Sequence, residues 1–280
     1  MAIRAKIFMC THREPLVIPP LCVLVQGGAK LKAPIENVIS DDGANGSISQ
    51  KNYHYCELTV QYYAWKNEDY DAYGFCQYRR LFCFDESVKK PYLTFGKLPK
   101  KKRDRLLGDK EKIKALIEEN DVIVPRSENI GVSVYDKYVN DKYNFKEDLD
   151  LFLDILKRQY PFLADFADEY MAMNTQYFCN MFIMKRDIFF EYSSMLFSIL
   201  EELDTKKVLH GDFQSDRTDG YLGERFLGIY LCYLRSRGAK IHEIARIDIN
   251  CSLSKRIINK LLPPETKRRF FFKKIFRSLK

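Results

Sequence analysis

Two adjacent arginines, Arg79 and Arg80, follow an apolar run at residues 73–78 that has the composition of a buried strand. A guanidinium can hold a phosphate through two parallel hydrogen bonds, so an arginine at a strand end is a candidate phosphate ligand. Consecutive strand residues point to opposite faces, and we therefore expect one of the two to face a cleft. The alternative is a pair of exposed arginines in surface ion pairs.

Four acidic residues could act as a base or as ligands. Glu224 lies on a predicted helix opposite its apolar face, where it is either a solvated residue or, if that side faces a cleft, a general base. Asp219, at the start of the same helix, is a second candidate base or an N-cap. Asp41 and Asp42 lie in a loop rich in Gly and Asn, where they are metal or ribose ligands or ordinary turn residues.

Further polar groups stand at element boundaries. Lys51 and Asn52 precede a helix predicted near Tyr55, and the backbone N–H groups at a helix start attract anions. Asn52 is equally suited to capping that helix. His12, at the end of the first predicted strand, either contacts a ligand or packs. Tyr55 belongs to an aromatic stripe that is typical of a core, although one ring could stack on a nucleobase.

Strands and helices alternate along the chain. Strands are predicted at residues 5–12, 21–25, 73–78, 121–125, 178–184 and 240–247, and a basic loop at 97–105. Helices are predicted at residues 55–67, 110–120, 147–159, 163–173 and 187–203, with a further helix around 222–234. This order favours an α/β fold with a single mainly parallel sheet flanked by helices and a helical second half. Ligands of such sheets bind beyond the carboxyl ends of the strands.

The composition excludes several classes of protein. No stretch of the 280 residues approaches the roughly 20 apolar residues of a membrane-spanning helix, and the N-terminus resembles a first strand more than a signal peptide. The eight cysteines form no C-x-x-C pair, which disfavours zinc and disulfides and favours a reducing compartment. No P-loop and no dinucleotide-binding glycine motif is present.

The basic charge is concentrated at the C-terminus. Residues 260–280 hold eight Lys or Arg and one Glu, and so account for +7 of the net charge of +8. This distribution disfavours nucleic-acid binding by the folded domain. We expect a domain over residues 1–262 and a basic amphipathic membrane-docking helix over 263–280. Its docking residues would be Lys267, Arg268, Arg269, Phe272, Lys273, Lys274, Ile275, Phe276, Arg277 and Leu279.

Several short motifs together resemble a known family. They are Ser49-Gln-Lys-Asn52, Tyr55-Cys-Glu-Leu-Thr59, Tyr63-Ala-Trp-Lys-Asn67 and Gly74-Phe-Cys-Gln-Tyr-Arg-Arg80, followed by Asn180-Met-Phe-Ile-Met184 and Gly220-Tyr-Leu-Gly-Glu-Arg225. The set is similar to that of bacterial capsular and exopolysaccharide glycosyltransferases, some of which are galactofuranosyltransferases. Gln77 replaces that family's His, and the loop at Asp41 lacks one of its acidic residues, which weakens a carboxylate-held metal.

The resemblance implies a nucleotide-sugar transferase fold and a hexosyltransferase active in surface-polysaccharide synthesis. Its partners would be a UDP-sugar donor, with UDP-galactofuranose as one candidate, a lipid-linked saccharide acceptor and an anionic membrane. The enzyme would act at the cytoplasmic face, with no nucleic acid as a partner. No cofactor is certain, and a divalent cation, manganese or magnesium, would be helpful at most. The expected donor site holds His12, Asp41, Asp42, Lys51, Asn52, Tyr55, Gln77, Tyr78, Arg79 and Arg80; the expected acceptor site holds Asn180, Arg217 and Arg225.

Two other readings remain open at this point. One is a different phosphosugar or nucleotidyl transferase, and the other is a non-catalytic, membrane-associated scaffold that binds glycan. Binding of nucleotide sugars would separate the transferase from the scaffold, because a ligand of the folded state raises the unfolding midpoint.

Overall fold

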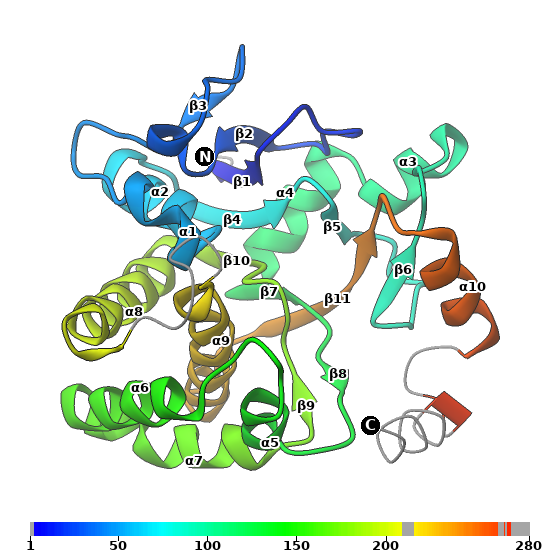
Figure 1. Cartoon of the computed structure of the whole chain (residues 1–280). Coiled ribbons are helices and arrows are strands. Elements are labelled where there is room, and N and C mark those ends of the chain that lie inside the picture. The colour runs from blue at the N-terminus through cyan, green and yellow to red at the C-terminus, as the bar shows by residue number, and fades with distance from the viewer. Residues whose placement is uncertain (1–2, 209–215, 263–265, 267, 270–280) are drawn as a thin grey trace.

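The computed structural model describes residues 3–208, 216–262, 266, 268 and 269. Their centre is a nine-stranded sheet (Figure 1). On one side of the sheet four neighbouring strands run parallel, in the order β3 (Ile39–Ser40), β2 (Cys22–Gln26), β1 (Ala5–Thr11) and β4 (Ala72–Gln77). Parallel strands end at the same edge, so β1 and β4 bring the residues that follow them together.

The rest of the sheet is mixed, which corrects the expectation of a single mainly parallel sheet. β10 (Phe182–Lys185) is antiparallel to both β4 and β7 (Val122–Pro125). β11 (Ile241–Asp248) runs parallel to β7 and β6 (Tyr92–Thr94) but antiparallel to β5 (Arg80–Cys83). A separate two-stranded sheet pairs β8 (Glu128–Asn129) with β9 (Thr175–Gln176). An apolar run does not encode strand direction, which is why the sequence pattern missed this.

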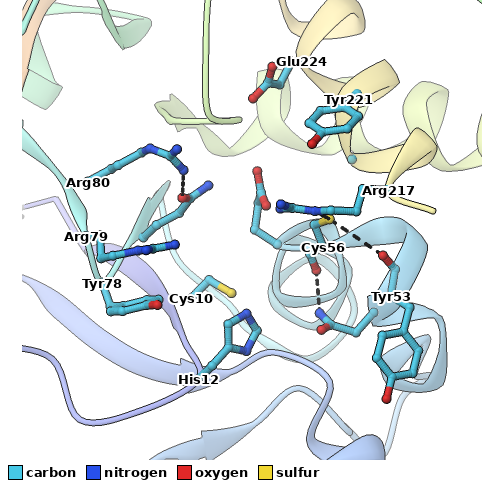
Figure 2. A pocket seen from close by; sticks show the side chains of 14 residues that line it. Cys10, His12, Tyr53, Cys56, Tyr78, Arg79, Arg80, Arg217, Tyr221 and Glu224 are labelled. Atoms are coloured by element: carbon cyan, nitrogen blue, oxygen red, sulfur yellow. Dashed lines mark hydrogen bonds between the residues drawn. The ribbon is translucent and has the colours of Figure 1, made fainter. Parts of the chain in front are cut away.

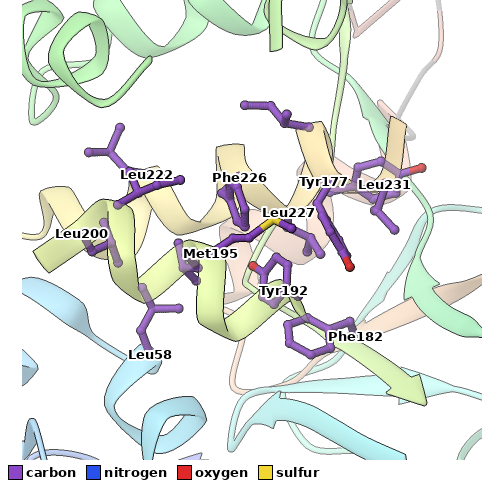
Figure 3. Close-up of a cluster of buried hydrophobic side chains, with 14 of the residues drawn as sticks. Leu58, Tyr177, Phe182, Tyr192, Met195, Leu200, Leu222, Phe226, Leu227 and Leu231 are labelled. Atoms are coloured by element: carbon purple, nitrogen blue, oxygen red, sulfur yellow. The ribbon is translucent and has the colours of Figure 1, made fainter. Parts of the chain in front are cut away.

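Side chains on the two faces of the sheet enter two different cores. In β1, Phe8 and Cys10 join the larger core, whereas Ile7 and Met9 join the smaller one, as the alternation of a strand requires. The larger core is built with α8 (Arg186–Lys206) and α9 (Thr218–Ser236), over which α5 (Val134–Val139), α6 (Lys146–Gln159) and α7 (Ala164–Ala172) pack (Figures 1 and 3). The smaller core includes residues of α3 (Lys100–Leu107) and α4 (Lys110–Glu119).

The helix predicted at residues 55–67 is broken in two. α1 spans Asn52–Tyr55 and α2 spans Leu58–Asn67. Between them Cys56 has a φ of 52°, which no helix allows. The Asn52 amide stabilises the break, since it donates to the Cys56 carbonyl at 2.6 Å and to the Thr59 hydroxyl at 2.9 Å. The break re-aims Cys56 and Glu57, and both line the cavity described below.

The region predicted as a basic loop contains the helix α3 instead. Its first six residues are charged, so they carry no apolar periodicity, and only Leu106 and Leu107 anchor it in the core. A further helix, α10 (Leu253–Leu261), was not predicted. The predicted docking helix at 263–280 lies almost wholly outside the described residues. Within the described part of the chain, no helix combines the length and apolarity needed to cross a membrane.

Candidate active site

A cavity of about 380 Å³ opens where β1 and β4 end (Figure 2). Four segments that are far apart in the sequence line it. They are the end of β1 with Cys10 and His12, the α1–α2 junction, the β4–β5 turn and the start of α9. The cavity therefore lies at the carboxyl ends of parallel strands, as expected for ligand sites in α/β sheets.

The β4–β5 turn presents both arginines to this cavity, although strand alternation predicted one. β4 ends at Gln77 and β5 begins at Arg80, so the pair does not lie within a single strand. Gln77 accepts a hydrogen bond from Arg80 and donates from its amide to the Cys179 carbonyl at 3.2 Å. Gln77 thus orients Arg80, while Arg79 is exposed and lies over the Tyr78 ring at 5.1 Å.

His12 contributes a neutral ring beside a cation. Its Nδ1 lies 3.1 Å from the Lys32 ammonium, which also donates to the Asn52 side-chain oxygen at 3.4 Å. His12 is exposed, but partial desolvation by the protein around it and then the charge of Lys32 lower its pKa below the ordinary 6.5. A neutral His12 at physiological pH can accept or donate a hydrogen bond to a ligand.

Two carboxylates, Glu57 and Glu224, line the cavity together. Both oxygens of Glu224 are engaged, one by the Cys179 N–H at 2.7 Å and the other by Arg225 at 3.1 Å. Glu57 accepts from the Asn180 amide at 3.0 Å. Burial first, and then the charge of Glu224, raise the pKa of Glu57 above its ordinary 4.5. Glu57 is therefore a stronger base than an ordinary carboxylate.

The start of α9 brings a third arginine to the cavity. The Arg217 Nε donates to the Cys56 sulfur at 3.1 Å, and Tyr221 lies one turn further along (Figure 2). Gly220 lets this helix approach α1 closely, since a Cβ there would meet the Cys56 sulfur at 3.0 Å. The three arginines and two carboxylates that line the cavity leave it a net positive charge.

Two expected acceptor residues lie behind the wall of the cavity. Asn180 is 2% exposed and donates to both Glu57 and the Gly220 carbonyl, so it ties the α1–α2 junction to α9. Arg225 is also buried, pairs with Glu224 and lies over the Tyr138 ring at 4.9 Å. Each can position a cavity residue, and neither lines the cavity itself.

The acidic loop does not reach the cavity. Asp41 is fully buried and accepts from the Gly28 N–H at 2.7 Å, the Ala29 N–H at 3.0 Å and the Ser49 hydroxyl at 2.5 Å. These bonds tie the chain after β2 to β3, which is a structural use of the carboxylate. Asp42 instead forms a surface ion pair with Lys30 at 3.1 Å.

Three other candidates meet in a separate buried cluster around Asp204. The Lys51 ammonium and the Tyr55 hydroxyl both donate to Asp204 at 2.8 Å. Asp219 is fully buried and pairs with Lys207, which also pairs with Asp204 at 3.1 Å. Burial raises the pKa of Asp219 to about 7. A carboxylate enclosed with its own counter-ion is poorly placed to act as a base on a ligand in the cavity.

Sequence reasoning passed over several cavity residues. Glu57 entered the sequence analysis only as part of a motif, and Cys10, Tyr53, Cys56 and Tyr221 were assigned no site role. The signal for Glu57 was its place in the Cys-Glu-Leu-Thr motif. As for metals, the described residues contain no group of three or more His, Cys, Asp or Glu that could hold an ion.

Comparisons with known proteins identify a family and one similar structure. A family model described as "Domain of unknown function (DUF4422)" matches residues 6–235. A solved structure titled as the bifunctional glycosyltransferase WbbM in its apo form is similar, with a TM-score of 0.81 and 27% sequence identity. The similarity covers 88% of this chain but 45% of the WbbM chain, so this chain spans less than half of that protein's length. No significant match was found among curated proteins.

Proposed function

We propose that this chain, which belongs to the DUF4422 family, is a glycosyltransferase that uses a nucleotide-diphosphate sugar. The similarity to the WbbM glycosyltransferase supports this activity. The observation that carries the proposal is the division of the cavity. Arg79, Arg80 and a neutral histidine stand at the strand-end side, whereas two carboxylates and Arg217 stand at the side formed by the α1–α2 junction and α9.

The arginine side suits the leaving group. When the bond between the anomeric carbon and the phosphate oxygen breaks, negative charge grows on the diphosphate. Arg80, oriented by Gln77, and Arg79 would stabilise that charge, and His12 with Lys32 would bind further phosphate or ribose oxygens. This assignment keeps the expected donor role for the β4–β5 turn and for His12, and leaves out Asp41, Asp42, Lys51 and Tyr55.

The carboxylate side suits the acceptor. The acceptor hydroxyl must lose its proton as its oxygen bonds to the anomeric carbon. In this proposal Glu57 takes that proton, because its raised pKa makes it a stronger base than an ordinary carboxylate. Glu224, expected as a candidate base, is instead given a positioning role, since the Cys179 N–H and Arg225 hold both its oxygens. Arg217 and Tyr221 would contact the acceptor sugar.

The finer identity of the substrates rests on the motif resemblance. We propose a UDP-sugar donor, with galactofuranose as one candidate sugar, and a lipid-linked saccharide acceptor in surface-polysaccharide synthesis. A lipid-linked acceptor places the enzyme at the cytoplasmic face of the membrane, where residues 263–280 would dock. A divalent cation would assist binding of the diphosphate at most, because the arginines already supply positive charge.

Ligand binding tests this function against its rivals. UDP and UDP-sugars should raise the unfolding midpoint of the wild-type protein, whereas Arg80→Ala should weaken that shift. Turnover should then be measured as UDP release in the presence of a glycan acceptor. Binding of UDP-sugars without any turnover would favour a glycan-binding scaffold. Release of UMP in place of UDP would favour a phosphosugar transferase, and release of sugar 1-phosphate would favour a nucleotidyl transferase.

A further inference from the structure

The helix α10 leaves its apolar side uncovered. Leu253, Ile257, Ile258 and Leu261 are 47–70% exposed, and α10 has no buried residue at all. At 100° per residue these four side chains fall within an arc of about 140° on the helix. Lys255, Arg256 and Lys260 occupy the remaining circumference. Such a helix is amphipathic without using its apolar face inside its own domain.

Beside α10 lies a hollow of about 490 Å³ that has both apolar and basic walls. Leu253 and Ile257 line it together with Tyr92, Leu93 and Phe95 around β6. Its basic residues are Lys90, Lys102, Arg256 and Lys260. Neither Arg256 nor Lys260 has a carboxylate partner among the described residues. The hollow therefore combines unpaired positive charge with an apolar surface.

The neighbouring helix α3 extends the positive surface. Lys102 of α3 lines the hollow and lies over the Phe95 ring at 5.8 Å. α3 carries five basic residues and one acidic residue, and all but its last two residues are at least partly exposed. Figure 1 shows α3, β6 and α10 together at one edge of the molecule. We call α10 and the residues of the hollow the α10 surface.

We propose that the α10 surface docks on an anionic lipid membrane, with the apolar face of α10 in the interface and headgroup phosphates at the basic residues of the hollow. Interfacial helices combine an apolar face with Lys and Arg in this way, and anionic lipids attract each basic residue near the surface. Membrane docking was proposed above for residues 263–280, and here it is proposed for a surface of the described domain as well. The docking does not depend on the reaction that the protein catalyses.

Charge complementarity selects this occupant over the alternatives. Arg269 lies beside the end of α10, because its guanidinium donates to the Asn259 side chain at 2.6 Å and to the Leu262 carbonyl at 3.1 Å. Residues 266–280 are themselves basic and apolar, so covering α10 with them would bring like charges together. A second copy would do the same. A nucleic acid would neutralise the charges but leave the apolar face in water.

Vesicle co-sedimentation of the full chain tests the proposal, with both the wild type and variants that leave residues 263–280 intact. Wild-type protein should pellet with phosphatidylcholine vesicles that contain phosphatidylglycerol, pellet less at high salt, and stay in solution with phosphatidylcholine alone. The double variants Ile257→Asp/Leu261→Asp and Arg256→Glu/Lys260→Glu should each bind roughly tenfold more weakly. All four positions are exposed, so the unfolding midpoint should not move.

Matched controls carry similar changes elsewhere. Ile18→Asp replaces an equally exposed apolar residue, and Lys110→Glu/Lys112→Glu reverses two exposed charges on α4, so both should bind like the wild type. Wild-type binding by both α10 variants would overturn the proposal, even if removal of residues 263–280 abolished docking. Equal binding to phosphatidylcholine alone, or a concentration-dependent dimer that both α10 variants abolish, would also overturn it.

Discussion

At the residue scale, the site depends on the different surroundings of two carboxylates, Glu57 and Glu224, that line one cavity. Glu224 was selected from the sequence as a candidate base, yet its two oxygens are bound by the Cys179 N–H and Arg225. Glu57 was not selected, although it belongs to the Tyr55-Cys-Glu-Leu-Thr59 motif. Only the break at Cys56 and the approach of α9 show that Glu57 lines the cavity. Side-chain roles of this kind depend on long-range packing that a local motif does not encode.

We predict that Glu57→Gln lowers kcat about 10²–10⁴-fold, the usual loss when a general base is removed. The base acts when deprotonated, and its pKa is raised by burial and by Glu224. Wild-type kcat/KM should therefore fall as pH drops through a value above the ordinary 4.5. The pH profile of the wild type and the residual rate of the variant measure this, and Glu224→Gln is the comparison. Near-normal turnover in Glu57→Gln would exclude the base.

The same raised pKa predicts a change in stability. A carboxyl with a raised pKa in the folded state stabilises the fold fully below its unfolded pKa and loses that contribution as pH rises through its folded pKa. At neutral pH the charged Glu57 is therefore a cost that Gln avoids. The unfolding midpoint of Glu57→Gln should therefore exceed that of the wild type at pH 7, and the difference between the two proteins should be smaller at pH 4. Calorimetry of both proteins at the two pH values measures this. A midpoint that falls at pH 7 would show that Glu57 instead holds the fold together.

Arg80 should contribute more to the reaction than Arg79, because Gln77 orients it and Arg79 is exposed. We expect Arg80→Ala to lose about 2–4 kcal/mol of transition-state stabilisation, the range for one charge-stabilising donor. Gln77→Ala should lose less, since it removes only the orientation. Values of kcat/KM for Arg80→Ala, Arg79→Ala and Gln77→Ala, each checked for an unchanged unfolding midpoint, test the order. Unaltered turnover in both arginine variants would remove the β4–β5 turn from the donor site.

At the element scale, the apolar periodicity predicted most helices and strands. It did not predict the direction of the strands or the points at which predicted elements are interrupted. The predicted strand at residues 178–184 starts only at Phe182, because Cys179 and Asn180 both have positive φ and form the turn that supports the site. β10 then pairs antiparallel with β4, and no residue pattern in the sequence predicts this direction. α3 escaped because its charged residues face solvent and leave no apolar stripe to recognise.

Asp41 belongs to this scale, because it joins elements and does not reach a ligand. Replacing it with Ala would leave two backbone N–H groups and the Ser49 hydroxyl without their charged acceptor. We expect a loss of about 2–3 kcal/mol of unfolding free energy, typical of hydrogen bonds to a buried charge. Denaturant unfolding measures it, with the exposed Asp42→Ala as the control. A stable Asp41→Ala protein that has lost activity, and regains it with manganese, would instead make Asp41 a metal ligand.

At the scale of the whole molecule, the mixed sheet brings together residues from opposite halves of the chain. His12 and the β4–β5 turn come from the first half, and Arg217, Tyr221 and Glu224 from α9. The family-like motifs indicated both groups in advance, but only the fold shows that they share one cavity. The basic C-terminus can be recognised in the sequence as a run of charges. The α10 surface can be recognised only in the structure, which shows a helix whose apolar face has no partner in the described domain.

At this scale we also predict how far turnover depends on a divalent cation. Arginines line the side of the cavity assigned to the diphosphate, so we expect a chelator to reduce turnover by less than about tenfold, well short of the loss of an essential electrophile. The measurement is UDP release with and without chelator, followed by addition of manganese or magnesium. Complete silencing that either ion reverses would contradict the expectation and would give a ligand role to the cavity carboxylates Glu57 and Glu224 or to Asp41.

The most direct test of the central claim is UDP-sugar turnover by the wild-type protein beside Glu57→Gln. Isothermal titration with UDP and UDP-sugars should give binding of similar strength to both proteins, because Glu57 stands on the acceptor side of the cavity. Only the wild type should then release UDP when a glycan acceptor is added. If the wild-type protein binds no UDP-sugar, or if Glu57→Gln transfers sugar at the wild-type rate, the account of this cavity is wrong.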